Sequence, residues 1–332
     1  MIKVLNEKEI DDTAWRNLLK NSRKATFFQS PECYQFYKKL SFLQPFLYGV
    51  SNQGVLTGLV CGYLIAEGGT LKRFFSRRAI IPGGVLLSDD ISDTALQMLL
   101  DVVKRDIKSK AVYVEIRNYH DYSAYRSVFY SSNFSFHSHY NIHVHADKEE
   151  QLLLNLNPTK RRQIKMAELA GVRVLETKEK NPLNQFYKIL FELYVTKIRK
   201  PLFYYEFFEK IIEEDFCKLF VAIKGDKVIG GMLTVEMNNN AVYEWFICGD
   251  DRNSKGYPSV LLTWNAIQYT AANNFRYFDF MGAGSPEKNK GIRRFKSGFG
   301  GKLTDMGRYV FISKPFIYRI GIMYLQLIKK MK

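Results

Sequence analysis

The stretch LFVAIKGDKVIGGML at residues 219–233 decides the fold, because a similar stretch, LYGVSNQGVLTGLV, occurs at residues 47–60. In both stretches an apolar run leads into a polar turn that contains glycine, and an aliphatic run with a further glycine follows. This order is typical of a β-hairpin. A hairpin that recurs far along the chain predicts two domains of similar construction.

The elements that follow the two hairpins also repeat. In the first half a helical pattern at 94–108 precedes an aromatic-containing strand pattern at 112–116. In the second half a helical pattern at 259–273 precedes a strand pattern at 277–280. Mixed strands covered by helices predict an α/β (α+β) fold in each half.

Each half ends in a further pair of strand-like segments, around 134–144 and around 301–312. A helix-start signal, HADKEE at 145–150, follows the first pair, and no low-complexity linker separates the halves. We therefore predict a first domain at 1–148, a second at 149–312, and a basic amphipathic helix at 313–332 that packs back on the first domain.

The composition is that of a strongly basic globular protein. Of the 332 residues, 46% are hydrophobic, and the formal net charge is +16, which favours polyanions such as nucleic acid, phosphorylated cofactors or an anionic membrane surface. The four cysteines lack C-x-x-C spacing, which favours a reducing compartment. The N-terminus does not resemble a signal peptide, and no stretch has the roughly 18 apolar residues of a membrane span. We expect a cytoplasmic protein, with the basic C-terminal helix suited to packing or to anionic lipid at the inner face of the membrane.

Several common motifs are absent or incomplete. His137, His139, His143 and His145 fall on alternate positions and would share one face of an extended strand, but no carboxylate or cysteine nearby completes a ligand set, so we predict no metal. The stretch GAGSPE at 282–287 lacks the third glycine of a dinucleotide-binding fingerprint. The sequence has no Walker loop, G-x-S-x-G elbow or H-E-x-x-H, so the motifs of common NTPases, hydrolases and metalloproteases are missing.

Two motifs late in the chain carry a family resemblance, FDFMG at 278–282 and FKSGFGG at 295–301. They resemble the Fem family of non-ribosomal peptidyltransferases, which add amino acids to peptidoglycan precursors, and the related BioF2-like acetyltransferases. TFFQSP at 26–31, IIPGG at 80–84 and the segment 161–174 resemble the family as well. The chain has no long helical insertion and is similar to the compact FemX type. The resemblance implies two tandem GNAT-like domains, an activated acyl donor and an amine acceptor.

The resemblance also implies roles for individual residues. Lys296 corresponds to the lysine that steadies the developing oxyanion. Arg199 corresponds to an arginine that binds acceptor phosphates, and Lys38 to a second phosphate-binding lysine. We expect the segment 295–300, which contains Lys296, to form the last core hairpin of the second domain.

The chemistry of acyl transfer asks for a fixed cation and a base. Attack of an amine on an ester or thioester builds negative charge on the carbonyl oxygen, and one fixed donor such as Lys296 lowers the barrier by about 3 kcal/mol. The amine must also lose a proton, for which Asp279 or Glu244 could serve if burial raises its pKa. Each of these carboxylates lies in a predicted strand and could instead only cap or pair.

The donor site is predicted from a degraded form of the acetyltransferase pyrophosphate loop, RNSKGYP at 252–258. A helix follows this loop, and its N-terminus would bind phosphate. Such a site suits both a tRNA acceptor end and coenzyme A, and we expect no tightly bound cofactor. The candidate donor-binding residues are Arg252, Lys255, Gly256 and Tyr257.

Three functions remain open on the sequence alone. The first is transfer of an aminoacyl group from aminoacyl-tRNA to an amine of a peptidoglycan precursor in cell-wall synthesis. The second is acyl-CoA-dependent N-acetylation of a sugar nucleotide or an envelope polysaccharide precursor. The third is non-catalytic binding of a polyanion, which the net charge would explain equally well. In each case we expect a monomer and an anionic partner.

Overall fold

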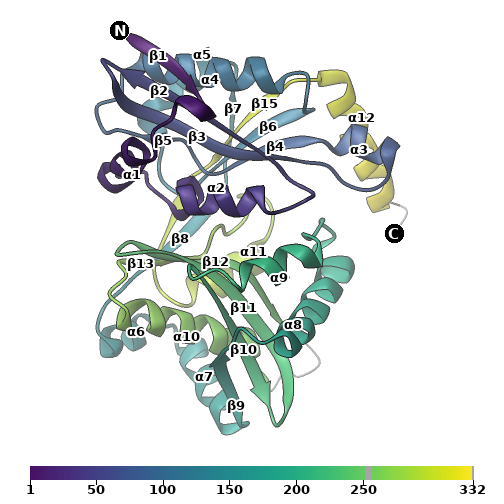
Figure 1. Cartoon of the computed structure of the whole chain (residues 1–332). Helices are drawn as coiled ribbons and strands as arrows, with labels where there is room; N and C mark the ends of the chain where they lie inside the picture. Colours follow the sequence, from purple (N-terminus) through teal and green to yellow (C-terminus); the bar gives the residue numbers. More distant parts are fainter. Residues whose placement is uncertain (251–255, 331–332) are drawn as a thin grey trace. The chain divides into compact units, whose positions relative to one another are not determined.

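The computed structural model describes residues 1–250 and 256–330 and divides the chain into two compact units (Figure 1). Unit 1 consists of Met1–Ser138 together with Asp305–Lys332, and unit 2 consists of His139–Thr304. Each unit is a mixed sheet flanked by helices, so the predicted fold class is confirmed.

Unit 1 is built on an eight-stranded sheet in the order β1-β2-β3-β4-β6-β15-β7, with β5 paired to β3. Its strands are β1 (Ile2–Asn6), β2 (Gln44–Asn52), β3 (Val55–Ile65), β4 (Arg78–Gly83), β5 (Leu86–Leu87), β6 (Tyr113–Asn118), β7 (Ser135–His137) and β15 (Arg308–Ile312). Its α-helices are α1 (Asp12–Asn21), α2 (Pro31–Lys38), α3 (Thr70–Ser76), α4 (Asp93–Ile107), α5 (Arg126–Ser131) and α12 (Pro315–Lys330). Short 3-10 turns occur at Glu7–Glu9, Phe27–Gln29 and Ser123–Tyr125.

Unit 2 is built on a seven-stranded sheet in the order β14-β8-β13-β12-β11-β10-β9. Its strands are β8 (Tyr140–His145), β9 (Val172–Glu176), β10 (Cys217–Lys224), β11 (Lys227–Met237), β12 (Ala241–Gly249), β13 (Tyr277–Asp279) and β14 (Lys302–Asp305). Its helices are α6 (Glu149–Asn155), α7 (Pro158–Leu169), α8 (Lys180–Leu193), α9 (Tyr205–Ile211), α10 (Pro258–Ala272) and α11 (Lys290–Ser297), with a π-helical turn at Tyr194–Ile198.

The repeated hairpins of the sequence are confirmed as β2/β3 and β10/β11. In the first hairpin the turn residues Gln53 and Gly54 have φ values of 51° and 84°. Two successive positive φ angles are what a two-residue turn needs in order to match the twist of its strands. The second hairpin turns at Gly225, which also has a positive φ.

One strand of each sheet comes from the part of the chain that the sequence assigns to the other domain. β8 precedes all other strands of unit 2 and pairs with β13, while β15 follows unit 2 in sequence and pairs with β6 and β7 of unit 1. The predicted domain ranges 1–148 and 149–312 therefore differ from the observed units at both ends. The cause is the backbone ladder, which assigns a strand to the sheet that satisfies its hydrogen bonds.

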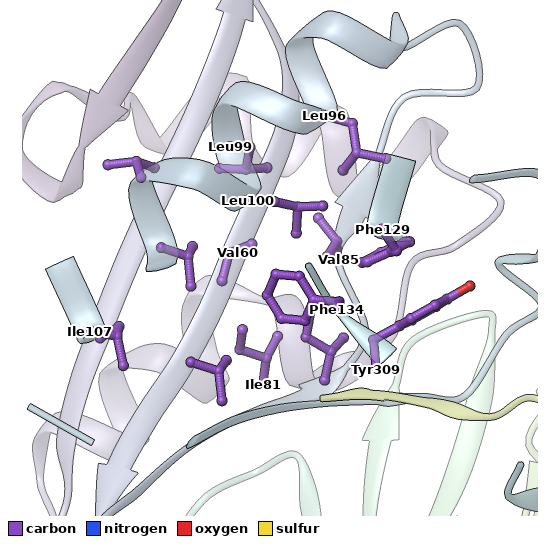
Figure 2. Close-up of a cluster of buried hydrophobic side chains, with 14 of the residues drawn as sticks. Val60, Ile81, Val85, Leu96, Leu99, Leu100, Ile107, Phe129, Phe134 and Tyr309 are labelled. Atoms are coloured by element: carbon purple, nitrogen blue, oxygen red, sulfur yellow. The ribbon is translucent and has the colours of Figure 1, made fainter. Parts of the chain in front are cut away.

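Side-chain packing agrees with this assignment of the strands. Tyr309 of β15 is fully buried in the core of unit 1, where its ring stacks on Phe129 with 3.8 Å between centroids (Figure 2). Ile142 and Val144 of β8 belong to the core of unit 2. α12 lies in unit 1, as Tyr318 packs edge-on against Tyr113 of β6.

The segment 295–300 is not a hairpin, which corrects the expectation from the sequence. Residues Lys290–Ser297 form α11, and the chain leaves this helix through Gly300 and Gly301, both at positive φ. Phe295 and Phe299 are four positions apart and therefore lie on the same side of the helical turn, where their rings contact each other. A helical rather than a two-residue period thus explains the aromatic spacing.

Candidate active site

The candidate site lies where two parallel strands of unit 2 stop pairing. β12 and β13 pair only from Ala241 with Tyr277 to Tyr243 with Asp279, although β12 continues to Gly249. The next residue of β12 after the last pair is Glu244. We call this end of the β12/β13 ladder the fork.

Two backbone irregularities shape the fork. On the β11 side Thr234 pairs with Glu244 but Leu233 pairs with Phe246, so Trp245 is an extra residue that forms a β-bulge. Bulges of this kind redirect neighbouring side chains and are frequent beside active sites. Beyond β13, Met281 has a φ of 53°, a left-handed conformation that a non-glycine residue rarely adopts.

Lys296 spans the fork from α11. Its Nζ lies 2.8 Å from Glu244 Oε1 and donates hydrogen bonds to the carbonyl oxygens of Phe280, at 2.8 Å, and Gly282, at 2.9 Å. An ammonium group has three protons, so all three are accepted by these partners. The predicted oxyanion role therefore requires an incoming oxygen to replace one of them.

Glu244 has the properties of a proton acceptor. Its side chain is almost completely buried, and its Oε2 atom has no hydrogen-bond partner among the described residues. Desolvation raises the pKa of Glu244, and the ammonium of Lys296 only partly offsets this effect. A buried carboxylate with a raised pKa and one unused oxygen is suited to take a proton from an amine.

Asp279, which forms the last pair of the ladder with Tyr243, has different partners from Glu244. Its Oδ1 accepts hydrogen bonds from Asn141 Nδ2 at 2.8 Å and from the Met281 amide at 2.6 Å. His143 Nε2 lies 3.1 Å from Oδ2. Burial works to raise the pKa of Asp279, but His143 and these hydrogen bonds outweigh it and the pKa is lowered. Asp279 is thus a weaker base than Glu244 and organises β8 against β13.

His143 and Asn141 are site residues that the sequence did not identify. The alternating histidines gave a signal for them, but the predicted single strand is interrupted, because β7 ends at His137 and β8 begins at Tyr140. Within the described residues no group of three or more histidine, cysteine, aspartate or glutamate side chains is arranged to hold a metal ion.

Lys160 is a second lysine beside the site. It lies in α7 and its side chain is buried, with Nζ 3.7 Å from the ring centroid of Phe295 and 4.9 Å from that of Phe299. Burial lowers the pKa of Lys160 to about 8. The two rings that contact this ammonium flank Lys296 in the sequence, so Lys160 supports the end of α11 that carries Lys296.

The polar loop before α11 is fixed by one arginine. Arg293 Nη2 donates to the carbonyl oxygen of Pro286 at 2.8 Å, and Nη1 donates to that of Lys288 at 2.6 Å. Because Arg293 lies one helical turn before Lys296, the loop and the lysine are held by the same helix.

The two predicted phosphate-binding residues do not belong to the fork. Lys38 is in unit 1, where its Nζ lies 2.6 Å from Glu7 Oε1 and over the ring of Tyr34. Arg199 is in unit 2, exposed at the end of the π-helical turn, with a φ of 53°.

The predicted donor-binding loop is described only in part. Arg252 and Lys255 lie outside the described residues. Gly256 is buried, and Tyr257 has a positive φ at the N-cap of α10, where no side chain caps the helix. The N-terminus of α10 is seated closely on the sheet, because a Cβ atom on Gly249 would come within 2.9 Å of Pro258.

Part of the chain matches a known protein family. Residues 157–296 match the family described as "Acetyltransferase (GNAT) domain", and this range lies within unit 2. The sequence comparison with curated proteins gave no match.

Among solved structures the chain resembles FemX, with a TM-score of 0.70 and 14% identity over 96% of this chain and 99% of FemX. It also resembles a tandem GNAT protein from the clavulanic acid biosynthesis pathway, with a TM-score of 0.60 and 7% identity over 94% of this chain and 99% of that one. L-PGS from Bacillus licheniformis matches with a TM-score of 0.56 and 14% identity, over 92% of each chain. Residues 157–296 therefore match a GNAT acetyltransferase domain, and the chain as a whole has the tandem fold seen in FemX.

Proposed function

We propose that the protein transfers an aminoacyl group from aminoacyl-tRNA to an amine of an anionic cell-wall precursor, at the fork of unit 2. One observation carries the proposal: Glu244, with a raised pKa and an unused Oε2, is joined to Lys296 where β12 and β13 stop pairing. The acceptor would be a peptidoglycan precursor, as the resemblance to the Fem family implies, and the reaction would take place at the cytoplasmic face of the membrane.

In the proposed reaction the acceptor amine attacks the ester carbonyl of the donor. Glu244 Oε2 takes a proton from the amine as the new C–N bond forms, because a neutral or partly deprotonated nitrogen is needed for attack. The C–O bond to the tRNA ribose then breaks, and the leaving oxygen receives a proton, for which protonated Glu244 is suited. Atoms and charge balance without a metal or a redox cofactor.

Lys296 would act in two ways. In the resting arrangement it fixes Glu244 and the two carbonyl groups on the other side of the fork. During attack the developing oxyanion would replace one carbonyl acceptor, since an anion accepts a stronger hydrogen bond from an ammonium than a neutral carbonyl does. Lys296→Met should therefore lower kcat at least tenfold, and unchanged turnover would reject both roles.

Phosphate groups of the acceptor would bind to basic side chains. Arg199 is exposed and, as a guanidinium, suits bidentate phosphate binding. Lys38 would have to exchange its partner Glu7 for the phosphate. The net charge of +16 would favour both tRNA and a phosphorylated acceptor.

Acyl-coenzyme A is the second candidate donor, and α10 supports it. The N-terminus of α10 follows β12 and has no side-chain cap, and the positive end of the helix dipole at such a position favours phosphate. The match of residues 157–296 to an acetyltransferase domain favours the same donor. The acceptor would then be an amine on a sugar nucleotide or an envelope polysaccharide precursor.

A donor assay separates these possibilities. Purified protein is mixed with an amine-bearing cell-wall precursor and either labelled aminoacyl-tRNA or labelled acetyl-coenzyme A, and transfer to the precursor is measured. Transfer from aminoacyl-tRNA alone is expected, and transfer from the thioester alone would establish the second candidate. Transfer from neither, combined with binding of tRNA by both wild type and Glu244→Gln, would point to a non-catalytic polyanion-binding protein.

A further inference from the structure

The surface of unit 1 around α3 and α12 carries apolar and basic groups that no part of the proposed reaction uses. α12 contacts unit 1 through Tyr318, yet it exposes Ile322 and, on one further face, three other large apolar side chains. Phe316, Ile320 and Met323 are 77%, 39% and 61% exposed. They occupy positions i, i+4 and i+7 of the helix and therefore form one stripe.

A second exposed apolar group lies on the neighbouring helix α3. Figure 1 shows α3 beside α12 in unit 1, and Phe74 of α3 is 56% exposed. Lys314, the residue before α12, joins the two helices, because its Nζ lies 5.6 Å from the Phe74 ring and donates a hydrogen bond to the carbonyl oxygen of Ser109 at 3.1 Å.

A basic hollow of about 510 Å³ opens between these elements. Its lining includes Arg73, Arg77, Lys110 and Lys314, and it contains no acidic side chain among the described residues. Arg73, Arg77 and Lys110 are exposed. Arg319 adds a further exposed cation one turn along α12. Four cations around one hollow, without a carboxylate, indicate an anionic partner.

We infer that α3 and α12 form a docking surface for an anionic lipid bilayer, with the phosphate of a lipid headgroup in the basic hollow. A bilayer presents both kinds of complementary surface, phosphates for Arg73 and Arg77 and acyl chains for Phe316 and Met323. Nucleic acid would use the cations but would leave the aliphatic side chains Ile320 and Met323 in water. The charge and the apolar stripe together thus favour a membrane.

The surface would attach unit 1 to the membrane by peripheral contact. Among the described residues no helix is long and apolar enough to cross a bilayer. Lys329, Lys330 and Lys332 add basic residues at the end of the same segment of sequence. Docking would therefore be reversible and would weaken as salt screens the basic side chains.

Vesicle sedimentation tests the inference with the full-length protein. Vesicles of phosphatidylcholine with about one third phosphatidylglycerol are compared with vesicles of pure phosphatidylcholine, at low and high salt. Wild type should sediment with the anionic vesicles and not with the neutral ones. The apolar variant Phe316→Ser/Ile320→Ser/Met323→Ser and the basic variant Arg73→Gln/Arg77→Gln/Lys110→Gln should each bind roughly tenfold less.

A matched control separates a built surface from general attraction by the net charge. Lys165→Gln/Lys224→Gln/Lys227→Gln removes the same charge from exposed positions of unit 2 and should bind like wild type. Equal loss in this control and the basic variant, or no loss in the apolar variant, would overturn the inference. Absence of wild-type binding to anionic vesicles would also overturn the inference. If light scattering then showed a dimer that the apolar variant disrupts, the apolar stripe would be assigned to contact with a second copy of the chain.

Two further measurements keep the test clear. Thermal unfolding by circular dichroism confirms that each variant is folded. Glu244→Gln should bind vesicles like wild type, because docking does not depend on turnover. If the protein lacked the proposed aminoacyl transfer but still bound vesicles, the proposed function would be wrong and the docking surface would be supported.

Discussion

Each unit contains a parallel strand pair, and the two pairs differ in whether their pairing continues along the strands. In unit 1 β4 and β6 pair without interruption from Arg78 with Tyr113 to Gly83 with Asn118. In unit 2 the corresponding pair, β12 and β13, stops after Tyr243 with Asp279. One ladder is closed along its length, and the other opens into a fork beside Lys296. The opening, rather than the strand order, distinguishes the unit that we propose to be catalytic.

The buried carboxylates at these strands differ in the same sense. In unit 1 Glu115 pairs with Arg117 and Arg308, one at each carboxylate oxygen, and these two guanidinium groups overcome desolvation and hold its pKa well below the usual range. In unit 2 Glu244 has one cation and one unused oxygen, and its pKa is raised. A carboxylate with both oxygens paired to cations can only hold a structure together. A carboxylate with one unpaired oxygen can also exchange a proton.

The largest expected effect comes from removing the base. Glu244→Gln keeps the shape of the side chain but cannot take a proton, so kcat should fall by about 10² to 10⁴. The change also leaves the buried ammonium of Lys296 without its carboxylate, so the unfolding temperature should fall as well, and kcat is compared well below that temperature. Steady-state transfer assays and calorimetry on the same preparation measure both quantities.

Glu236→Gln is the matched control for this change. Glu236 lies on the adjacent strand β11 and also has a pKa raised by burial, but it is hydrogen-bonded to Tyr269 rather than to Lys296. Its replacement should leave kcat within about threefold of wild type. A similar loss in both variants would show that burial of charge, not proton transfer, explains the effect.

The counterpart in unit 1 should affect stability. Glu115→Gln leaves the half-buried guanidinium groups of Arg117 and Arg308 without their carboxylate, which should reduce the free energy of unfolding by about 2 to 3 kcal/mol. Glu32→Gln removes the carboxylate from a solvent-exposed pair with Arg16 and should cost at most about 1 kcal/mol. Urea denaturation measures the free energy of unfolding of both variants. Equal losses would show that the cluster of Glu115, Arg117 and Arg308 contributes no more to stability than a surface pair.

The two carboxylates should also give opposite pH dependence. The folded pKa of Glu244 lies above its ordinary value of 4.5, so the folded state binds the extra proton between those values and stability falls as pH rises through that interval. The folded pKa of Glu115 lies below 4.5, so its contribution is present above 4.5 and is lost as pH falls. Each glutamine variant should remove its own component from stability curves measured by denaturation at successive pH values. Curves that shift in the same direction for both variants would contradict the comparison.

Much of the fold was predictable from local patterns, but the sheets to which β8 and β15 belong were not. Turn residues such as Gly54 and Gly225 determine their hairpins by backbone conformation alone, so both were found in the sequence. β8 and β15 are distinguished only by which sheet they pair with, and this choice depends on partners far away in the chain. No local pattern of polar and apolar residues carries that information.

The candidate site was predictable in part for the same reason. Lys296 and Glu244 were identified as catalytic candidates, but their contact of 2.8 Å joins a helix to a strand and is created by the fold. The sequence makes Asp279 an equal candidate for the base, but His143 lies beside it in the fold and lowers its pKa, which depends on neighbours in space. Lys160 was visible in the sequence only as part of a basic run.

The smallest expected effect concerns Lys160, a buried lysine of unit 2. The cluster around Glu115 in unit 1 has no counterpart to it. Lys160→Met keeps an apolar stem against Phe295 and Phe299 and removes only the ammonium. The folded pKa is about 8 and the ordinary value is 10.5, so between them the unfolded state binds more protons and wild-type stability rises with pH. The difference in unfolding free energy between wild type and Lys160→Met should therefore grow in favour of wild type over this interval. Lys165→Met, exposed on the same helix, should show no such trend. A constant difference for Lys160 would mean that its ammonium is not desolvated by the two rings, and the fork would then be supported by packing alone.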